Sequence, residues 1–181
     1  MLIELDPVDR ITADAVGEPG DRSFFIQARK DGRLVTVLVE KQQVQLLAAS
    51  ILEILARVEE PTGEGDPAAA MALEEPVVPE WRAGRLSIGY QEERDLVLLE
   101  VEELVPDPED ADSAAGTELQ DEVREPGSVR FWATREQMLA MARHGAAVCA
   151  AGRPLCQFCE NPIDPEGHVC PAMNGHRDLA E

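Results

Sequence analysis

Residues 23–58 read SFFIQARKDGRLVTVLVEKQQVQLLAASILEILARV, and they carry the strongest fold signals in the chain. Two apolar or alternating runs, at 23–28 and 34–40, are separated by Asp31-Gly32. Both turn residues tolerate positive φ, so the pattern predicts a tight β-hairpin. Apolar residues then recur at helical spacing, which predicts an amphipathic helix with one buried stripe. The stripe comprises Val44, Leu47, Ala48, Ile51, Leu55 and Val58.

The chain on either side of this stretch adds further strand signals. MLIELD, residues 1–6, predicts one strand. Residues 86–91 and 95–104 are apolar or alternating, and they predict a second hairpin that turns through the polar residues 92–94.

A second helix is predicted near the C-terminus. Residues 128–152, SVRFWATREQMLAMARHGAAVCAAG, read as a strand that runs into a helix ending near Gly152. Thr134 is a suitable N-cap, and Gln137 stands three residues later, where it completes a capping box. The predicted buried face comprises Met138, Met141, Ala142 and Val148.

The two helix starts resemble each other. VEKQQVQLLAA at 39–49 and ATREQMLAMAR at 133–143 share a strand end, a polar cap, a glutamine and an apolar helix face. The chain therefore reads as two strand–helix halves, each with a preceding hairpin. We predict an α+β fold in which two main helices cover one face of a largely antiparallel sheet. We assign residues 1–152 to this domain and residues 153–181 to a small tail.

Two segments interrupt the periodic pattern. Residues 59–80 and 106–127 are rich in proline, glycine and acidic residues, which predicts flexible loops. The chain has a formal net charge of −20, and 21 acidic residues against four arginines fall between Glu59 and Glu125. The charge thus indicates solvated loops, with an acidic surface for a basic partner as the alternative.

The overall charge also limits the classes of partner. A polyanion repels nucleic acid and anionic membrane surfaces, and the longest basic cluster is Arg29-Lys30. The N-terminus lacks the pattern of a signal peptide, and no apolar run approaches the ~18 residues of a membrane span. We expect a cytoplasmic protein with no membrane contact.

Cysteine and histidine gather in the tail, which reads RPLCQFCENPIDPEGHVCPAMNGHRD at 153–178. In a reducing compartment such clusters bind metal more often than they form disulfides. Cys156 and Cys159 have the two-residue gap of a zinc knuckle, residues 161–167 can return the chain, and Cys170-Pro171 begins the second half. The pattern looks like a small zinc ribbon and predicts a Zn²⁺ site.

The fourth ligand is ambiguous. A standard ribbon would have a cysteine at 173, where this chain has Met173, and a thioether is a poor zinc ligand. We favour His176, which follows an Asn-Gly turn, over His168, with Cys149 as a weaker candidate. Four protein ligands would leave no open position for water, so the predicted zinc is structural. A thiol redox pair and metal-free loop cysteines are the alternatives.

No common catalytic motif is present. The chain has no phosphate-binding GxxxxGK[ST], no GxGxxG after a strand, no GxSxG and no HExxH. The sequence therefore identifies no catalytic residues. An enzyme of unrecognised type would have its site between sheet and helices, using groups such as His144, Arg130 or Glu100.

Three stretches carry a family resemblance: FFIQARKDGRLVTVLVEKQQ, VRFWATREQMLAMARHG and AGRPLCQFCENPIDPEGHVCPAMNGH. The chain resembles an uncharacterised family of actinobacterial proteins, a domain of unknown function of similar length. The resemblance implies a cytoplasmic protein with a zinc-ribbon-like end, and it implies no particular activity.

These observations favour a non-catalytic binding or adaptor protein with a structural zinc site and protein partners. Nucleic-acid binding through the ribbon is disfavoured, because residues 153–178 have two arginines against four acidic residues. The oligomeric state has no signal in the sequence.

Overall fold

The hairpin predicted at Asp31-Gly32 is present in the computed structural model. β3 (Ser23–Lys30) pairs antiparallel with β4 (Arg33–Val39), and the two turn residues have φ of 48° and 79°. β2 (Arg10–Val16), which was not predicted from the sequence, pairs with the other side of β3. The structure describes residues 1–67, 70–105, 125–152, 156–159, 161, 163, 167–173 and 177–178.

The second predicted hairpin is also confirmed. β5 (Ala83–Gln91) and β6 (Leu96–Glu103) pair antiparallel and are joined by the short 3-10 helix η2 (Glu92–Arg94). β7 (Ser128–Thr134) pairs antiparallel with β6. The predicted N-terminal strand, β1 (Leu2–Leu5), joins this sheet by pairing parallel with β7. The sheet has the order β1-β7-β6-β5.

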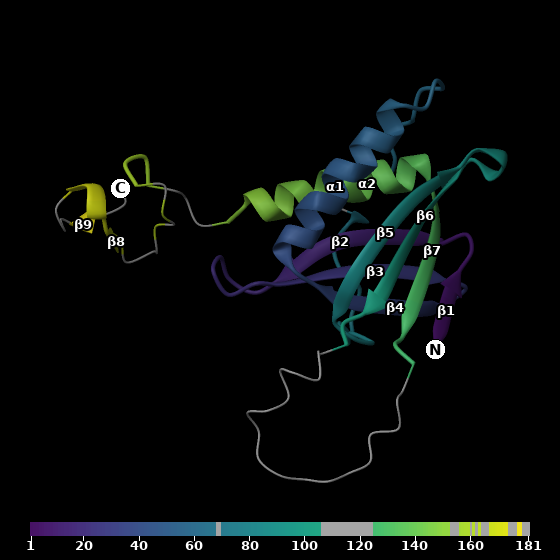
Figure 1. Cartoon of the computed structure of the whole chain (residues 1–181), viewed down its shortest axis with the longest axis horizontal. Coiled ribbons are helices and arrows are strands. Elements are labelled where there is room, and N and C mark those ends of the chain that lie inside the picture. The colour runs from purple at the N-terminus through teal and green to yellow at the C-terminus, as the bar shows by residue number, and fades with distance from the viewer. Residues whose placement is uncertain are drawn as a thin grey trace, which may run out of the picture.

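Each half of the body is a three-stranded antiparallel meander followed by a helix. Strands β2, β3 and β4 lead into α1 (Lys41–Ala56), and strands β5, β6 and β7 lead into α2 (Arg135–Ala150). The helices exchange partners, because α1 packs on β5 and α2 packs on β2, while the two helices also pack on each other (Figure 1). The resemblance between the two helix starts thus corresponds to a repeated order of elements.

The two helix starts are built in the same way. Gln137 accepts a hydrogen bond from the Thr134 N–H at 2.9 Å, and Gln43 accepts one from the Glu40 N–H at 2.8 Å. The amide of Gln43 also donates to the Gly84 carbonyl at 2.9 Å, so the glutamine ties α1 to β5. The capping box predicted at α2 is confirmed, with its counterpart at α1.

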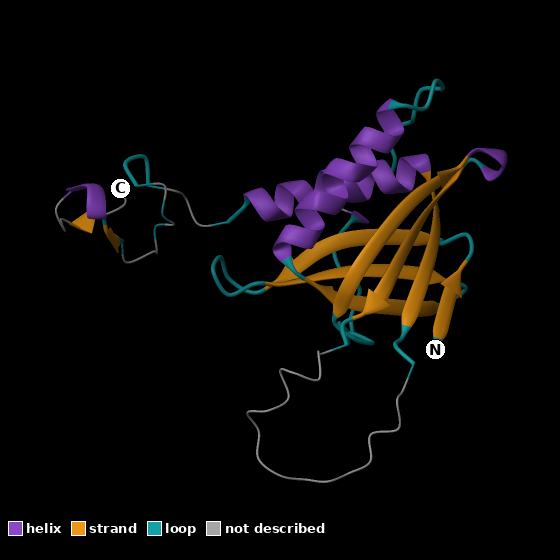
Figure 2. Cartoon of the chain, viewed as in Figure 1, coloured by secondary structure: helices purple, strands orange, loops and turns teal. Residues whose placement is uncertain are grey.

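The α+β class with largely antiparallel strands is confirmed. Both helices lie on the same side of the strands (Figure 2). The strands of the body fall into two sheets, β1-β7-β6-β5 and β2-β3-β4, which are linked by a bridge between Leu38 of β4 and Arg82. The two helices have 16 residues each, and in the described part of the chain no helix is long and apolar enough to cross a membrane.

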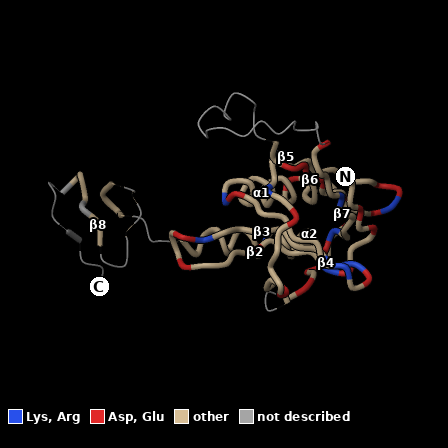
Figure 3. The backbone as a smooth tube through the Cα atoms, turned by 90° about the horizontal axis from the view of Figure 1, so that it is seen from below, with Lys and Arg blue, Asp and Glu red and all other residues tan. Residues whose placement is uncertain are grey.

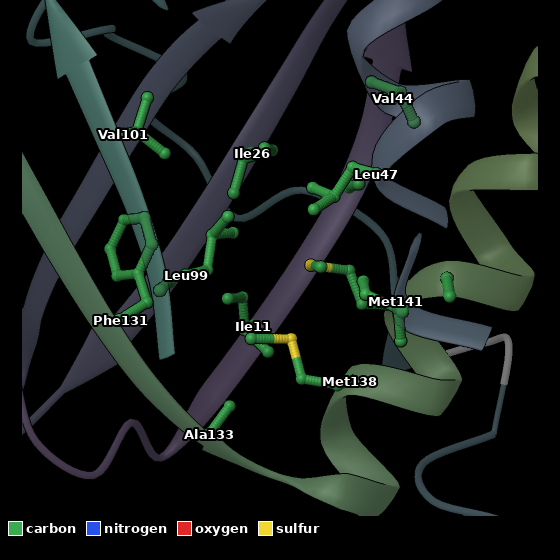
Figure 4. Packing of buried hydrophobic residues seen from close by; sticks show 14 of the residues in the cluster. Ile11, Ile26, Val44, Leu47, Leu99, Val101, Phe131, Ala133, Met138 and Met141 are labelled. Atoms are coloured by element: carbon green, nitrogen blue, oxygen red, sulfur yellow. The ribbon is translucent and has the colours of Figure 1, made fainter. Parts of the chain in front are cut away.

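The core lies where helices and sheets meet, and it uses the predicted stripes. Side chains of both helices point toward those of both sheets (Figure 4). Val58 and Val148 are only half-buried. The predicted residues that are buried are Val44, Leu47, Ala48, Ile51, Leu55, Met138, Met141 and Ala142. Charged residues lie mostly in turns and at the ends of elements (Figure 3).

In its described residues, 59–67 and 70–80, the segment predicted as a flexible loop has little regular structure, but it is anchored to the body. We call residues 60–67 and 70–80 the strap. Met71, at its middle, is 1% exposed and belongs to the core. Its carbonyl accepts a hydrogen bond from Thr12, and Glu74 exchanges hydrogen bonds with Gln27 at 2.7 and 3.0 Å.

The physical reason is a row of polar side chains. Thr12, Gln27 and Thr36 are paired across β2, β3 and β4 and are almost completely buried. Buried polar groups need hydrogen-bond partners, and the strap main chain supplies them for Thr12 and Gln27. The other predicted loop, 106–127, lies outside the described residues except for 125–127.

Candidate metal centre

The first half of the metal centre is a tight loop after α2. The Cys156 N–H donates to the Asn161 carbonyl at 2.8 Å, which closes the loop. The Phe158 N–H donates to the Cys156 sulfur at 3.4 Å. Residues 157–159 form a turn, so this CxxC does not open a helix as thioredoxin-type pairs do.

The second half is a short two-stranded sheet. β8 (His168–Val169) pairs antiparallel with β9 (Arg177–Asp178), and the 3-10 helix η4 (Pro171–Met173) lies between them in the chain. His168 begins β8, and Cys170 directly follows it. The ligands of this half thus lie at the start of β8 and directly after its end.

Four side chains converge from the two halves. One ligand atom each from Cys156, Cys159, His168 and Cys170 lies within 4.8 Å of all the others. The sulfurs of Cys156 and Cys170 are 3.8 Å apart, and the Cys159 sulfur is 3.3 Å from Nε2 of His168. The cluster can hold a metal ion.

The environment favours metal binding over a disulfide. All four cysteines of the chain are free, and a separation of 3.8 Å is far longer than an S–S bond of about 2.05 Å. Cys156 and Cys170 are 2% and 0% exposed. The Phe158 N–H, helped by hydrogen bonds from Cys159 and Cys170, lowers the pKa of Cys156, whereas burial and the neighbouring sulfurs raise the pKa of Cys159.

The predicted ligands can now be placed. The structure brings the three tail cysteines together with His168, which was the alternative fourth ligand. His176, which we favoured, lies outside the described residues. Cys149 lies in α2 and not in the cluster, where its sulfur is 3.8 Å from the Lys41 carbonyl. Burial raises the pKa of Cys149, so its thiol is an unreactive part of the core.

The residues suggested for an enzyme site do not converge. Glu100 and Arg130 are cross-strand partners on β6 and β7, joined by an ion pair of 2.9 Å. His144 instead faces Asp14 of β2, with Nε2 at 3.4 Å from the carboxylate. It lines a cavity of about 420 Å³ between α2 and the strap, and neither Glu100 nor Arg130 is part of that lining.

A polar network at the start of α2 was missed by the sequence reasoning. Arg135 is 6% exposed and donates to Asp95 at 2.7 Å, and the Tyr90 hydroxyl donates to the same carboxylate at 2.7 Å. These two hydrogen bonds lower the pKa of Asp95, and the bond to Asp95 raises the pKa of Tyr90. No local pattern could reveal the network, because Arg135 of α2 is 40 positions from Asp95, which directly follows η2.

With the geometry in hand, the chain can be compared with known proteins. A family model described as "Protein of unknown function (DUF3090)" matches residues 3–170. The chain belongs to this family. The match spans both halves of the body and ends at Cys170, so it includes all four residues of the cluster. No curated protein and no solved structure matches the chain.

Proposed function

We propose that this DUF3090 protein is a non-catalytic adaptor whose tail is organised by a structural zinc ion. The observation that carries the proposal is the convergence of Cys156, Cys159, His168 and Cys170 within 4.8 Å. Three thiolates and an imidazole are the ligand set that zinc prefers in structural sites. A cytoplasmic location belongs to the proposal, since the thiols must stay reduced.

One separation within the cluster matches a tetrahedral zinc site. Two sulfurs at about 2.3 Å from a tetrahedral zinc ion lie about 3.8 Å from each other. The sulfurs of Cys156 and Cys170 have that separation, 3.8 Å. Four protein ligands would fill the tetrahedron, so no position would remain for a reactive water molecule.

The adaptor role is supported by the surface of the tail. Phe158 stands between the two knuckle cysteines and is 54% exposed. An aromatic side chain on a rigid loop provides a large contact area at low entropic cost, and aromatic residues dominate binding energy at interfaces. The metal would hold the loop, and Phe158 would contact the partner.

The metal is tested by reconstitution. We expect protein purified under reducing conditions and supplied with Zn²⁺ to retain one ion per chain after gel filtration, as measured by mass spectrometry of the metal. Co²⁺ should give the absorption of a tetrahedral thiolate site. A stoichiometry well below one, or an octahedral cobalt spectrum, would overturn the proposed centre.

The adaptor role is tested by a matched pair of variants. Phe158→Ala removes the exposed ring, and Gln157→Ala truncates the neighbouring exposed side chain. Both should retain the metal, because neither residue is a ligand. Pull-down from native lysate should recover the same partner with wild type and Gln157→Ala and lose it with Phe158→Ala. Recovery of no specific partner, or equal recovery with all three proteins, would contradict the proposal.

A further inference from the structure

A groove runs along the seam between α1 and the edge strand β5. At one end it is a hollow of about 220 Å³ between the side chains of α1 and β5. A second hollow of about 870 Å³ continues from the first, and the two share Ile88. We call this surface the α1–β5 groove. Its lining from the helix side includes Leu46, Leu47, Ser50, Ile54 and Val58, and from the strand side Gly84, Leu86, Ser87, Ile88 and Tyr90.

The strand side of the groove is an unpaired sheet edge. β5 stands at the end of its sheet, and among the described residues the bridge to another strand on this side is at Arg82, just before β5, which pairs with Leu38 of β4. The side-chain amide of Gln43 donates hydrogen bonds to the carbonyls of Ala83 and Gly84, so these two groups are not available to an added strand. The remainder, from Leu86 to Tyr90, presents the main-chain groups that an added strand would pair with.

The equivalent seam in the other half of the molecule, between α2 and β2, is covered by the chain itself. The strap passes over α2 so closely that a Cβ on Gly65 would lie 2.2 Å from the Glu136 carbonyl and 3.1 Å from Cβ of Ala140. The strap then meets β2, where Arg10 and Thr12 donate to its carbonyls. An irregular segment with one inserted apolar residue, Met71, thus closes this seam.

A comparison of equivalent positions on the two helices shows that the α1–β5 groove has no covering segment like the strap. When Gln43 is aligned with Gln137, Leu46 corresponds to Ala140. Ala140 is 5% exposed beneath the strap, whereas Leu46 is 62% exposed. The larger apolar side chain is therefore the uncovered one. Ser87 of β5 is also part of the groove lining.

The charge of the groove indicates the kind of segment that would fit. Its wide end is lined by Glu59, Glu60, Glu92 and Asp95, with Arg57 as the one basic residue. Arg57 is paired with Glu53, and Asp95 is paired with the buried Arg135. Among the described residues Glu59 and Glu92 take part in no ion pair, so this end would attract a cation.

We propose that the α1–β5 groove binds an extended peptide of a partner protein, in the way that the α2–β2 seam holds the strap. An apolar side chain of the peptide would insert beside Leu46 and Ile88, and a lysine or arginine would meet Glu59 and Glu92. The segment from Leu86 to Tyr90 accommodates about five residues of extended chain, roughly 17 Å. The proposal deepens the adaptor function and rests on it.

Other occupants fit less well. Residues 106–124 of the same chain contain seven acidic residues and one arginine, so the wide end would repel them. A second copy of the chain would bring another acidic surface, given the net charge of −20. Occupancy by a second copy is a measurable outcome of the test below.

The test is a selection of random dodecapeptides, displayed on phage, against the full zinc-loaded chain. We expect enriched peptides with alternating apolar residues and a basic residue near one end. The best peptide, labelled with fluorescein, should bind to wild type in an anisotropy titration. Leu46→Glu should weaken binding by about tenfold or more, whereas Leu52→Glu, an exposed leucine of α1 outside the groove, should leave it unchanged.

Charge reversal gives a second, independent measurement. Glu59→Lys with Glu92→Lys should weaken the peptide about as strongly and reduce the salt dependence of its binding. Glu93→Lys, which changes the neighbouring exposed residue outside the lining, is the control. No enriched peptide, or a peptide indifferent to both groove variants, overturns the proposal. Self-association of the wild type that Leu46→Glu abolishes would show that a second copy is the occupant, and would equally overturn it.

Failure of this proposal can be told apart from failure of the adaptor function. A native partner that is lost with Phe158→Ala but retained with Leu46→Glu would leave the adaptor function intact and remove the groove proposal. If a selected peptide requires Leu46 for binding but the tail takes up no metal, the groove proposal would stand and the proposed adaptor function with its zinc site would fail.

Discussion

The body and the tail of this protein are ordered by different means. In the body, burial is spread over both sheets and both helices, so the loss of any one contact leaves many others. In the described part of the tail, Cys156 and Cys170 are the buried residues, and both are members of the metal cluster. A chain segment this short has no apolar core, and a metal can replace one. A substitution in the body should therefore leave the tail unaffected, and a substitution in the tail should leave the body unaffected.

Removal of two metal ligands should give the largest difference between the tail and the body. Cys156→Ser together with Cys159→Ser should abolish metal binding, because two of the four donors are lost, and the tail should become sensitive to proteases. The thermal unfolding of the body should not change. Metal analysis, limited proteolysis and calorimetry measure the three effects. Cys149→Ser is the control and should keep the full metal content, since that sulfur is not in the cluster.

Phe131→Ala addresses the body alone. The ring is completely buried between the sheets and the helices, so its loss should destabilise the body by about 3–5 kcal/mol. Urea unfolding followed by tryptophan fluorescence measures the change, and Leu52→Ala on the exposed side of α1 should change stability by less than about 0.5 kcal/mol. A parallel loss of metal would show that the two parts are coupled.

Met71→Ala tests whether the strap contributes to the stability of the body. If the side chain is part of the core, its truncation should cost about 2–3 kcal/mol in the free energy of unfolding. A segment that only linked the two halves would tolerate the change. Replacement of the exposed Val78, which lies later in the strap, is the matched control and should have little effect.

The smallest effect is expected from Asp95→Asn, and it depends on pH. The pKa of Asp95 is lowered in the folded protein by its bonds to Arg135 and Tyr90, so the carboxylate contributes stability above its unfolded pKa of about 3.9. That contribution is lost as the pH falls through the lowered folded-state pKa. The variant should therefore be less stable than wild type at neutral pH and should approach it in strong acid. A constant difference across this range would contradict the assignment.

Much of the body could be predicted because its signals are local. Asp31-Gly32 specifies a turn through backbone conformation alone, and Thr134 with Gln137 specifies a helix start within one turn of chain. The buried stripe of α1 follows from its period. Each of these depends on residues a few positions apart, and each is confirmed, except that Val58 lies beyond the end of α1 and is half-buried.

The remaining features depend on residues far apart in the chain. The parallel pairing of β1 with β7 and the exchange of helices between the halves leave no local pattern. The strap has the composition of a linker, yet Met71 is buried and the main chain of the strap hydrogen-bonds to the buried Thr12 and Gln27. In the tail, spacing identifies the cysteines, whereas the choice between His168 and His176 depends on how the chain returns.

The exchange of helices has a consequence for how the molecule could be divided. A fragment of residues 1–80 would expose the face of α1 that rests on β5, and a fragment of residues 81–181 would expose the face of α2 that rests on β2. Each piece would carry the complement of the other's exposed surface. The two fragments should therefore bind each other when they are produced separately. Such a pair would be suited to use as a split reporter.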